Sequence, residues 1–347
     1  MHHIPFERRT AATRRVILSR PAGTSAELVA AVVRVAVGVP PNRRSMNPTL
    51  QGLIAAGALW AATPLAGQQG SLLIVGGGAQ PPELVQRFVD LAGGAGAARI
   101  AVIPLASESP QEAGDEKVAQ FVGEYGADAF VLLPLPAQAV AGMPGALDGV
   151  TGVWFSGGDQ ARITDVLAGT RLLEQIRTLY RRGAVIGGTS AGAAIMSDSM
   201  LTGNQFDADT VGYFGDEFPV IAARRIQVVP GLGFLPGTIV DQHFLARERH
   251  NRLISAVLER PSLVGVGIDE STAIEVHPGG RWRVLGASQV IIYDAREATV
   301  VARATQLGAT GIRVHLLLSG SVFDPATGDT TLTPGPLGVS PSQENPQ

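Results

Sequence analysis

A serine set among small residues is the first candidate for chemistry in this chain. The pentapeptide GTSAG at residues 188–192 follows the apolar run 184–187 and precedes a helix-like stretch. This is the G-x-S-x-G pattern of a nucleophile elbow, in which a sharp strand-to-helix turn exposes the serine hydroxyl. The following helix directs its first N–H groups at the reacting carbonyl. We therefore predict Ser190 as an acyl-transfer nucleophile and the Ala191 N–H as an oxyanion donor; an ordinary glycine turn is the alternative.

A second glycine turn, FSGGDQ at residues 155–160, ends another apolar run. Glycine lets the backbone approach a ligand closely, so the N–H of Gly157 or Gly158 is a candidate for the second oxyanion donor. Gln160 is a candidate for binding polar groups of a substrate. Glycine-rich strand ends are usual in α/β folds, so a purely structural turn is the alternative.

One histidine stands out as a candidate general base. The chain has histidines at 2, 3, 243, 250, 277 and 315. Only His243 directly follows an apolar strand pattern, at 238–240, and precedes a segment with helical spacing that carries Arg247, Arg249 and Arg252. Guanidinium groups bind carboxylates through paired hydrogen bonds, so these arginines are candidates for substrate recognition. On a helix Arg249 and Arg252 share a face, and a solvated helix surface is the alternative.

A carboxylate that orients the imidazole would complete a Ser-His-acid triad. The apolar run 264–268 ends in Asp269 and Glu270, and Asp241 lies two residues before the histidine. The spacing does not choose among these three carboxylates. With the acid at 269 or 270, the chain order differs from the serine, acid, histidine order of common α/β-hydrolases, which argues against an ordinary esterase or lipase.

The elements that would position these residues alternate along the chain. Short apolar runs at 72–75, 99–105, 129–133, 152–155 and 184–187 alternate with helical patterns at 82–92, 115–125, 163–167 and 172–182. We therefore predict an α/β fold with a mostly parallel sheet, helices on both faces, and closing strands at 290–293, 299–302 and 312–318. In such sheets sites form at the carboxyl ends of strands, where the motifs fall.

The N-terminal region differs in charge from the rest of the chain. The whole chain carries a formal net charge of −3, but residues 1–66 hold eight arginines against two glutamates, which leaves a net charge of −9 on the remainder. We expect a basic leader at 1–45, with Met46 as an alternative start of translation, and a signal peptide at 46–66. The apolar run 50–62 is too short for a stable membrane span. The expected localisation is secreted or periplasmic, with a cytoplasmic or membrane-anchored protein as the alternative.

Composition excludes several classes of site and partner. The chain has no cysteine, so disulfides, thiolate zinc sites, a cysteine nucleophile and a lipoprotein anchor are excluded. The mildly acidic charge gives no reason to expect nucleic acid, and no closely spaced histidine pair outside the leader indicates a metal. We expect no cofactor.

The domain organisation that we predict is a single α/β domain at 67–318 and a flexible tail at 319–347 that is rich in Pro, Ser, Thr and Gly.

Taken together, the motifs resemble those of the cyanophycinase family. They are FSGGDQ at 155–160, GGTSAGA at 187–193, DQHF at 241–244 and GIDESTA at 267–273, in this order within residues 71–293. The resemblance implies a serine peptidase with a class I glutamine amidotransferase-like fold, related to peptidase E. It also implies Ser190 as nucleophile, His243 as base and Glu270 as orienting acid. The substrate-binding residues that it implies are Gln160, Asp241, Gln242, Arg247, Arg249 and Arg252.

The resemblance further implies a substrate. The family is made up of exopeptidases that hydrolyse cyanophycin, a poly-aspartate chain with arginine on each β-carboxyl group, to β-Asp-Arg dipeptides, and arginines that clamp carboxylates fit such a substrate. We expect a peptide or polymer substrate, no nucleic acid partner, and a homodimer as a candidate assembly. The alternatives are a dipeptidase for aspartyl or isoaspartyl peptides and a secreted peptide-binding module without catalysis. The segment 204–225 is expected to be a long loop that shapes the pocket.

Overall fold

The computed structural model describes residues 70–333, apart from 208–209, 213–214 and 216. These residues all belong to the compact unit that begins at Ala61. The expected leader at 1–45 and signal peptide at 46–66 lie outside the described residues, as do residues 334–347. Among the helices of the described part, none is long and apolar enough to cross a membrane.

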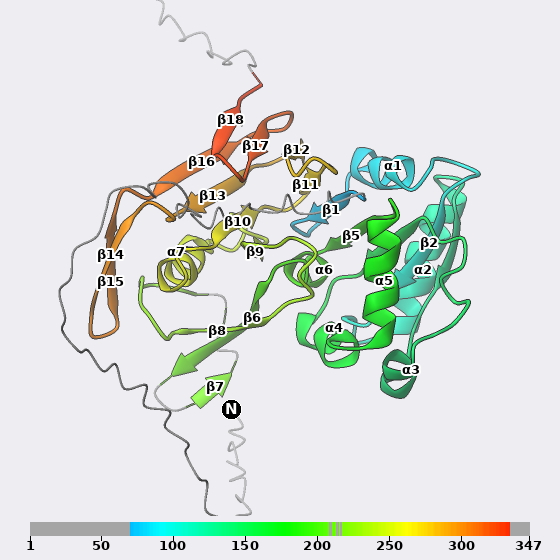
Figure 1. Ribbon diagram of the computed structural model, residues 1–347, viewed down its shortest axis with the longest axis horizontal. Helices are drawn as coiled ribbons and strands as arrows, with labels where there is room; N and C mark the ends of the chain where they lie inside the picture. Colours follow the sequence, from blue (N-terminus) through cyan, green and yellow to red (C-terminus); the bar gives the residue numbers. More distant parts are fainter. Residues whose placement is uncertain (1–69, 208–209, 213–214, 216, 334–347) are drawn as a thin grey trace, which may run out of the picture. The chain divides into compact units, whose positions relative to one another are not determined.

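Five parallel strands form one side of the larger sheet, whose order is β18-β17-β12-β11-β1-β5-β4-β2-β3 (Figure 1). The parallel strands are β1 (Leu72–Val75), β2 (Arg99–Ile103), β3 (Asp128–Val131), β4 (Gly152–Phe155) and β5 (Val185–Thr189). The antiparallel strands beyond β1 are β11 (Thr272–Val276), β12 (Trp282–Gly286), β17 (Val322–Asp324) and β18 (Asp329–Thr331). The strands that open the chain therefore build the parallel half of the sheet, and later segments extend it.

Helices cover both faces of this sheet because side chains alternate along its strands. Leu73 and Val75 of β1 join a core with α1 (Pro82–Leu91) and α2 (Pro110–Gly123). Leu72 and Ile74 join the opposite core, to which the remaining helices around this sheet contribute. Those helices are α3 (Pro136–Ala141), α4 (Gln160–Leu167), α5 (Arg171–Arg181) and α6 (Ala191–Ala194). The predicted α/β fold with helices on both faces is confirmed.

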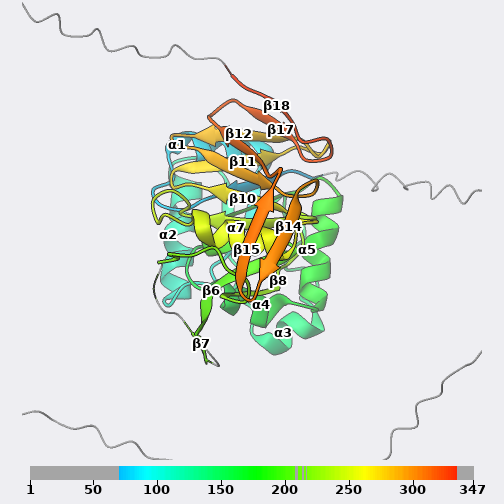
Figure 2. The ribbon, with the colours of Figure 1, turned by 90° about the vertical axis from the view of Figure 1, so that its left-hand side faces the viewer.

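A second, four-stranded sheet has the order β16-β13-β10-β9. Its strands are β9 (Thr238–Gln242), β10 (Val264–Ile268), β13 (Val290–Asp294) and β16 (Arg313–Leu317). β9 and β10 are parallel and are connected through α7 (His250–Glu259), so their carboxyl ends lie at the same edge. Of the expected closing strands, β13 and β16 join this sheet, whereas β14 (Thr299–Arg303) pairs with β15 (Gln306–Thr310) as a separate hairpin. Figure 2 shows that hairpin in front of α7.

The expected long loop at 204–225 is partly wrong. β6 (Ser199–Asp207), β7 (Thr210–Gly212) and β8 (Ile226–Pro230) form a three-stranded antiparallel sheet. The polar composition of this segment gave no apolar pattern that would indicate strands. The strands are defined by backbone hydrogen bonds, which polar residues form as well as apolar ones. Buried Met200 and Leu201 lie at the start of β6, before the polar residues begin.

The boundary expected at residue 318 differs from the structure as well. Residues 319–347 were expected to be a flexible tail, but β17 pairs with β12 and β18 pairs with β17. Phe323 is fully buried and packs on Trp282, with ring centroids 5.2 Å apart. Strand pairing and this aromatic contact therefore attach the segment to the sheet, and the described residues continue to Thr333.

Candidate active site

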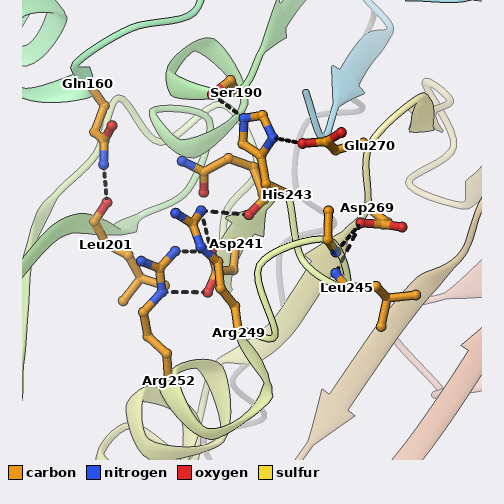
Figure 3. Close-up of polar contacts among 12 residues, drawn as sticks. Gln160, Ser190, Leu201, Asp241, His243, Leu245, Arg249, Arg252, Asp269 and Glu270 are labelled. Carbon is orange, nitrogen blue, oxygen red and sulfur yellow. Dashed lines mark hydrogen bonds and ion pairs between the residues drawn. The ribbon is translucent and has the colours of Figure 1, made fainter. Parts of the chain in front are cut away.

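The three residues expected to form a triad meet at the carboxyl ends of strands from both sheets (Figure 3). Ser190 directly follows β5 of the larger sheet, His243 directly follows β9 of the smaller one, and Glu270 lies two residues after β10. Ser190 Oγ is 2.9 Å from His243 Nε2, and His243 Nδ1 is 2.6 Å from Glu270 Oε1. The structure thus brings into one hydrogen-bonded series three residues that lie 53 and 27 positions apart along the chain.

The backbone at Ser190 has the strained conformation of a nucleophile elbow. Its φ of 53° and ψ of −110° lie outside the usual regions for a non-glycine residue. The helix α6 begins at the next residue, and Ala191, Ala193 and Ala194 are fully buried. Their small side chains let the turn pack closely against the sheet, which leaves the Ser190 hydroxyl directed at the imidazole.

His243 is held in one tautomer by its two partners. It is 8% exposed, and because Glu270 accepts from Nδ1–H, Nε2 is left to accept from the Ser190 hydroxyl. Burial lowers the pKa of His243 below its ordinary 6.5, the hydrogen bond to Glu270 opposes that change, and the positive charges of Arg247 and Arg249 add to it. The imidazole is therefore neutral at pH 7 and can accept a proton.

The structure distinguishes among the three carboxylates that the sequence left open. Glu270 contacts the imidazole. Asp269 accepts hydrogen bonds from the N–H groups of Leu245 (3.0 Å) and Ala246 (2.9 Å) and from the Ser288 hydroxyl (2.6 Å). Burial alone would raise the pKa of Asp269, but these hydrogen bonds outweigh it and keep the pKa below 3.8. Asp269 therefore fixes the chain after His243, while Glu270 is placed to orient the base.

Residues 243–249 form turns, so the helix expected directly after His243 is wrong at its start. His243 and Glu248 have φ angles of 50° and 51°, which a helix does not allow, and α7 begins at His250. The expectation that Arg249 and Arg252 lie on the same side is nevertheless confirmed, because both guanidinium groups lie at Asp241. Arg247 is exposed, whereas Arg249 and Arg252 are only 4% and 3% exposed.

Asp241 organises the two buried arginines. Arg252 binds its carboxylate with two hydrogen bonds, one of them from Nε at 2.9 Å, and Arg249 Nη1 lies 3.7 Å from the same group. Arg249 also donates to the Gln242 carbonyl oxygen at 2.7 Å. Asp241 is fully buried and lies outside the cavity lining. Asp241 therefore lies behind the cavity surface and contacts the guanidinium groups that line it. Its expected role in substrate binding stays a prediction.

The series opens into a cavity of about 490 Å³. Expected residues that line it are Gly158, Gln160, Ser190, Gln242, His243, Arg247, Arg249 and Arg252. Residues that the sequence did not single out are Asp159, Ala161, Thr202, Gly203 and Asn204. Of these, only Asp159 had a signal in the sequence, because aspartate before a helical pattern is a typical N-cap residue. In the structure its side chain caps α4 by accepting from the Ala161 N–H. The β6 residues carried none, since only the fold brings that strand to the cavity.

Gln160 and the candidate oxyanion donors lie around the serine. Gln160 is 6% exposed and donates from Nε2 to the Leu201 carbonyl oxygen at 2.7 Å, so it fixes β6 as a wall of the cavity. Gly157 lies close to the serine, because a methyl group built on it would be 3.3 Å from Ser190 Cβ. Within the described residues, no group of three or more His, Asp or Glu side chains is arranged to hold a metal ion.

Comparison with known proteins places the chain in a family. The model of peptidase family S51 matches residues 72–283, which span all the residues of the hydrogen-bonded series. The chain belongs to peptidase family S51. This S51 peptidase is similar to the cyanophycinase of Nostoc sp., at 34% identity over 295 residues that cover 81% of this chain and 93% of the relative. It is equally similar to that of Geminocystis herdmanii, at 34% identity over 74% of this chain and 94% of the relative.

Two solved structures also match this S51 peptidase. One is a peptidase from an acI-B1 actinobacterium, with 23% identity, a TM-score of 0.48 and coverage of 71% of this chain and 96% of that one. The other is a putative peptidase E protein from Listeria monocytogenes, with 15% identity, a TM-score of 0.43 and coverage of 63% and 99%. The family and the cyanophycinase relatives identify the protein as a serine-type peptidase, a hydrolase of peptide bonds.

Proposed function

We propose that this S51 peptidase hydrolyses cyanophycin to β-Asp-Arg dipeptides through an acyl-enzyme. The observation that carries the proposal is the series Ser190–His243–Glu270 at a cavity lined by three arginines. The similarity to cyanophycinases, which extends over most of the chain and of each relative, supports the choice of polymer.

The reaction follows from the two hydrogen bonds of the series. Ser190 Oγ attacks the scissile carbonyl carbon while His243 Nε2 takes the hydroxyl proton. Glu270 keeps Nδ1–H in place and stabilises the imidazolium. The imidazolium then protonates the leaving amine, and a water molecule activated by the same imidazole hydrolyses the ester. Since the pKa of His243 lies below 6.5, the base is ready to act at neutral pH.

Backbone N–H groups would stabilise the tetrahedral oxyanion. The Ala191 N–H follows the nucleophile directly, and Gly157 or Gly158 supplies the second donor from the end of β4. The nearness of Gly157 to Ser190 Cβ and the place of Gly158 in the cavity wall are consistent with either assignment.

The charges around the cavity suit a substrate that carries carboxylates. Arg247, Arg249 and Arg252 line it, and Asp241 neutralises only part of their charge. Gln242 adds an acceptor, because its Oε1 is buried and has no hydrogen-bond partner among the described residues. A substrate group that offers both a carboxylate and N–H donors, as the arginine residues of cyanophycin do, would match these side chains.

The test is release of β-Asp-Arg from purified cyanophycin, measured by chromatography with mass spectrometry. The native chain should release the dipeptide, and Ser190→Ala should lower turnover by about 10⁴-fold or more. Ser255→Ala is the matched control, because Ser255 is fully buried in α7 away from the cavity. Normal turnover by Ser190→Ala would show that the mechanism is wrong.

A dipeptidase for aspartyl or isoaspartyl peptides is the second candidate function. The same arginine-lined cavity favours it, because a cavity of about 490 Å³ accommodates a short acidic peptide without any contact from a polymer. Assays with Asp-X and isoaspartyl dipeptides beside cyanophycin discriminate the two. A kcat/KM higher for the dipeptides than for cyanophycin would assign the dipeptidase function.

A further inference from the structure

The end of β1 and the glycine loop that follows it, Gly76–Gly78, together hydrogen-bond to all three segments of the series. Successive carbonyl oxygens from Val75 onward each accept a hydrogen bond from a different segment. The bonds run from the Ser190 N–H to Val75 (3.0 Å), from the His243 N–H to Gly76 (2.8 Å) and from the Ser271 N–H to Gly77 (2.9 Å). Ser190, His243 and Ser271 are thus tied through their backbone N–H groups to three consecutive residues, the last of β1 and the first two of the loop.

The three donors share an unusual backbone conformation. Ser190, His243 and Ser271 have φ angles of 53°, 50° and 53°. Non-glycine residues in this region carry a cost of about 1–3 kcal/mol each, and they persist where surrounding structure holds them. The hydrogen bonds to the loop supply such restraint at the backbone of the two catalytic candidates and of the residue that follows Glu270.

The glycines of the loop also contact the side chains of the series. A methyl group built on Gly77 would lie 2.9 Å from Nδ1 of His243 and closer still to Cε1 and Nε2. One built on Gly78 would lie 2.8 Å from both Cβ and Oε2 of Glu270. The imidazole and the carboxylate therefore occupy space that is open only because these two positions lack a side chain.

We propose that Gly77 and Gly78 are positioning residues of the active site: Gly77 sets the place of the imidazole against Ser190, and Gly78 sets the place of the carboxylate against the imidazole. The inference rests on the triad in the proposed function but not on its substrate. Neither glycine has a side chain that could take part in the reaction, so each acts through a neighbouring side chain, Gly77 through His243 and Gly78 through Glu270.

The chain offers controls that separate this role from a need for glycine in a turn. Gly77 has a φ of 116°, and Gly93 has the same φ, but a methyl group on Gly93 would come no closer than 3.6 Å to any other atom. Gly78 has a φ of 67°, and Gly169, with a φ of 71°, has nothing within 4 Å of such a methyl group. Each control carries the backbone strain of its partner without the steric displacement.

The first experiment compares Gly77→Ala with Gly93→Ala in the full chain. A misplacement of about 1 Å costs about 100-fold in rate, so Gly77→Ala should lower kcat by about that factor relative to Gly93→Ala. KM should be unchanged, because the substrate-binding side chains come from other segments. The rate at which a fluorophosphonate labels Ser190 should fall in parallel. Equal kcat and labelling rates in the two variants, or a change confined to KM, would overturn the role of Gly77.

The second experiment uses Gly78→Ala. Alanine tolerates the φ of 67° at this position better than the φ of 116° at Gly77, so this variant keeps the proposal testable if Gly77→Ala does not fold. Displacing Glu270 removes the hydrogen bond that raises the pKa of His243, so the acidic limb of the labelling rate should move to lower pH. The rate itself should fall by about 10- to 100-fold. Gly169→Ala should change neither. A Gly78→Ala variant that behaves as Gly169→Ala would overturn the role of Gly78.

Phosphonate labelling separates this inference from the choice of substrate. A native chain that is labelled at Ser190 but does not degrade cyanophycin refutes the proposed substrate, and the glycine comparison is then decided by the labelling rates. A folded native chain that is neither labelled nor active refutes the triad and this inference with it.

Discussion

The proposed nucleophile, Ser190, and the proposed base, His243, follow strand ends that are built in opposite ways. The end of β5 consists of small residues without charge, and Ser190 is positioned there by a strained turn and by close backbone packing. The ends of β9 and β10 carry Asp241, Asp269 and Glu270 together with the arginines after His243, and side-chain hydrogen bonds position the base. Close packing of small residues positions Ser190 at the end of β5. At the ends of β9 and β10, side-chain hydrogen bonds and ion pairs act in addition to packing against Gly77 and Gly78.

The difference between the end of β5 and the ends of β9 and β10 predicts which substitutions each region tolerates. Packing around Ser190 responds to added volume, because protein interiors leave no space for an extra methyl group. The charged region responds to removal of a partner, because a buried charge left unpaired is costly. Substitutions in the charged region should therefore divide into those that affect the reaction and those that affect the stability of the fold.

The largest effect is expected from His243. His243→Gln removes the proton acceptor and should lower kcat by about 10⁴-fold or more. His250→Gln is the matched control in the same sheet region, because His250 bonds the Tyr293 hydroxyl at 2.7 Å and packs edge-on against Phe244. Comparable losses in the two variants, measured on cyanophycin, would contradict the assignment of the base.

The neighbours Asp269 and Glu270 should give opposite results. Glu270→Gln should lower kcat by about 10³- to 10⁴-fold with little change in stability, because its side chain is 40% exposed and its main partner is the imidazole. Asp269→Asn should cost about 1.5–3 kcal/mol in the free energy of unfolding, because its hydrogen bonds hold residues 245–246.

The pH dependence distinguishes the two variants further. The pKa of Asp269 is lower in the folded chain than its ordinary 3.8, so the carboxylate stabilises the fold above that pH. This contribution is lost as the pH falls through the lowered pKa, and urea unfolding of Asp269→Asn should lack that part of the pH dependence. An unchanged profile would contradict the hydrogen-bonding role.

The buried ion pair between Arg252 and Asp241 should contribute more to the free energy of unfolding than an exposed ion pair does. Arg252→Met leaves the fully buried Asp241 without its two-point partner and should destabilise the fold by about 3–5 kcal/mol. Asp128→Asn, which breaks the exposed pair with Arg99, should cost less than about 1 kcal/mol. Urea denaturation of both variants measures the difference, and equal losses would show that Asp241 does not depend on Arg252.

The smallest effect is expected from Arg247. Burial is the main cause of the lowered pKa of His243, and the positive charge of exposed Arg247 adds to it. Arg247→Gln should therefore raise that pKa, which shifts the acidic limb of phosphonate labelling upward by a fraction of a pH unit. The shift should shrink at high salt and be absent in Arg303→Gln, a change on the exposed hairpin. A shift in the opposite direction would contradict the electrostatic contribution.

The sequence predicted the uncharged region better than the charged one. The GTSAG turn is local, so its spacing alone indicated the strand, the turn and the exposed hydroxyl. The partners of Asp241 and Asp269 come from α7, the 245–246 turn and Ser288, and no local pattern reveals which pairs form. The sequence alone therefore left three acids open, and the resemblance to a family favoured Glu270.

The division into two sheets was likewise not apparent from the pattern of apolar runs. The spacing predicted strands near β9, β10 and β13, but an apolar run does not reveal which strand it pairs with. The left-handed turn at His243 was also missed, because the arginines after it have helical spacing and His243 itself gives no turn signal. Both features depend on contacts between segments far apart in the chain.

The hydrogen bonds to the loop after β1 have a consequence for local opening. Amide protons in turns usually exchange with solvent through small fluctuations that leave the rest of the fold intact. The amides of Ser190, His243 and Ser271 instead bond to consecutive carbonyls beside β1, a strand hydrogen-bonded on both sides within the larger sheet. They should exchange as slowly as core strand amides, so the active site should be among the last regions to open before the whole domain unfolds.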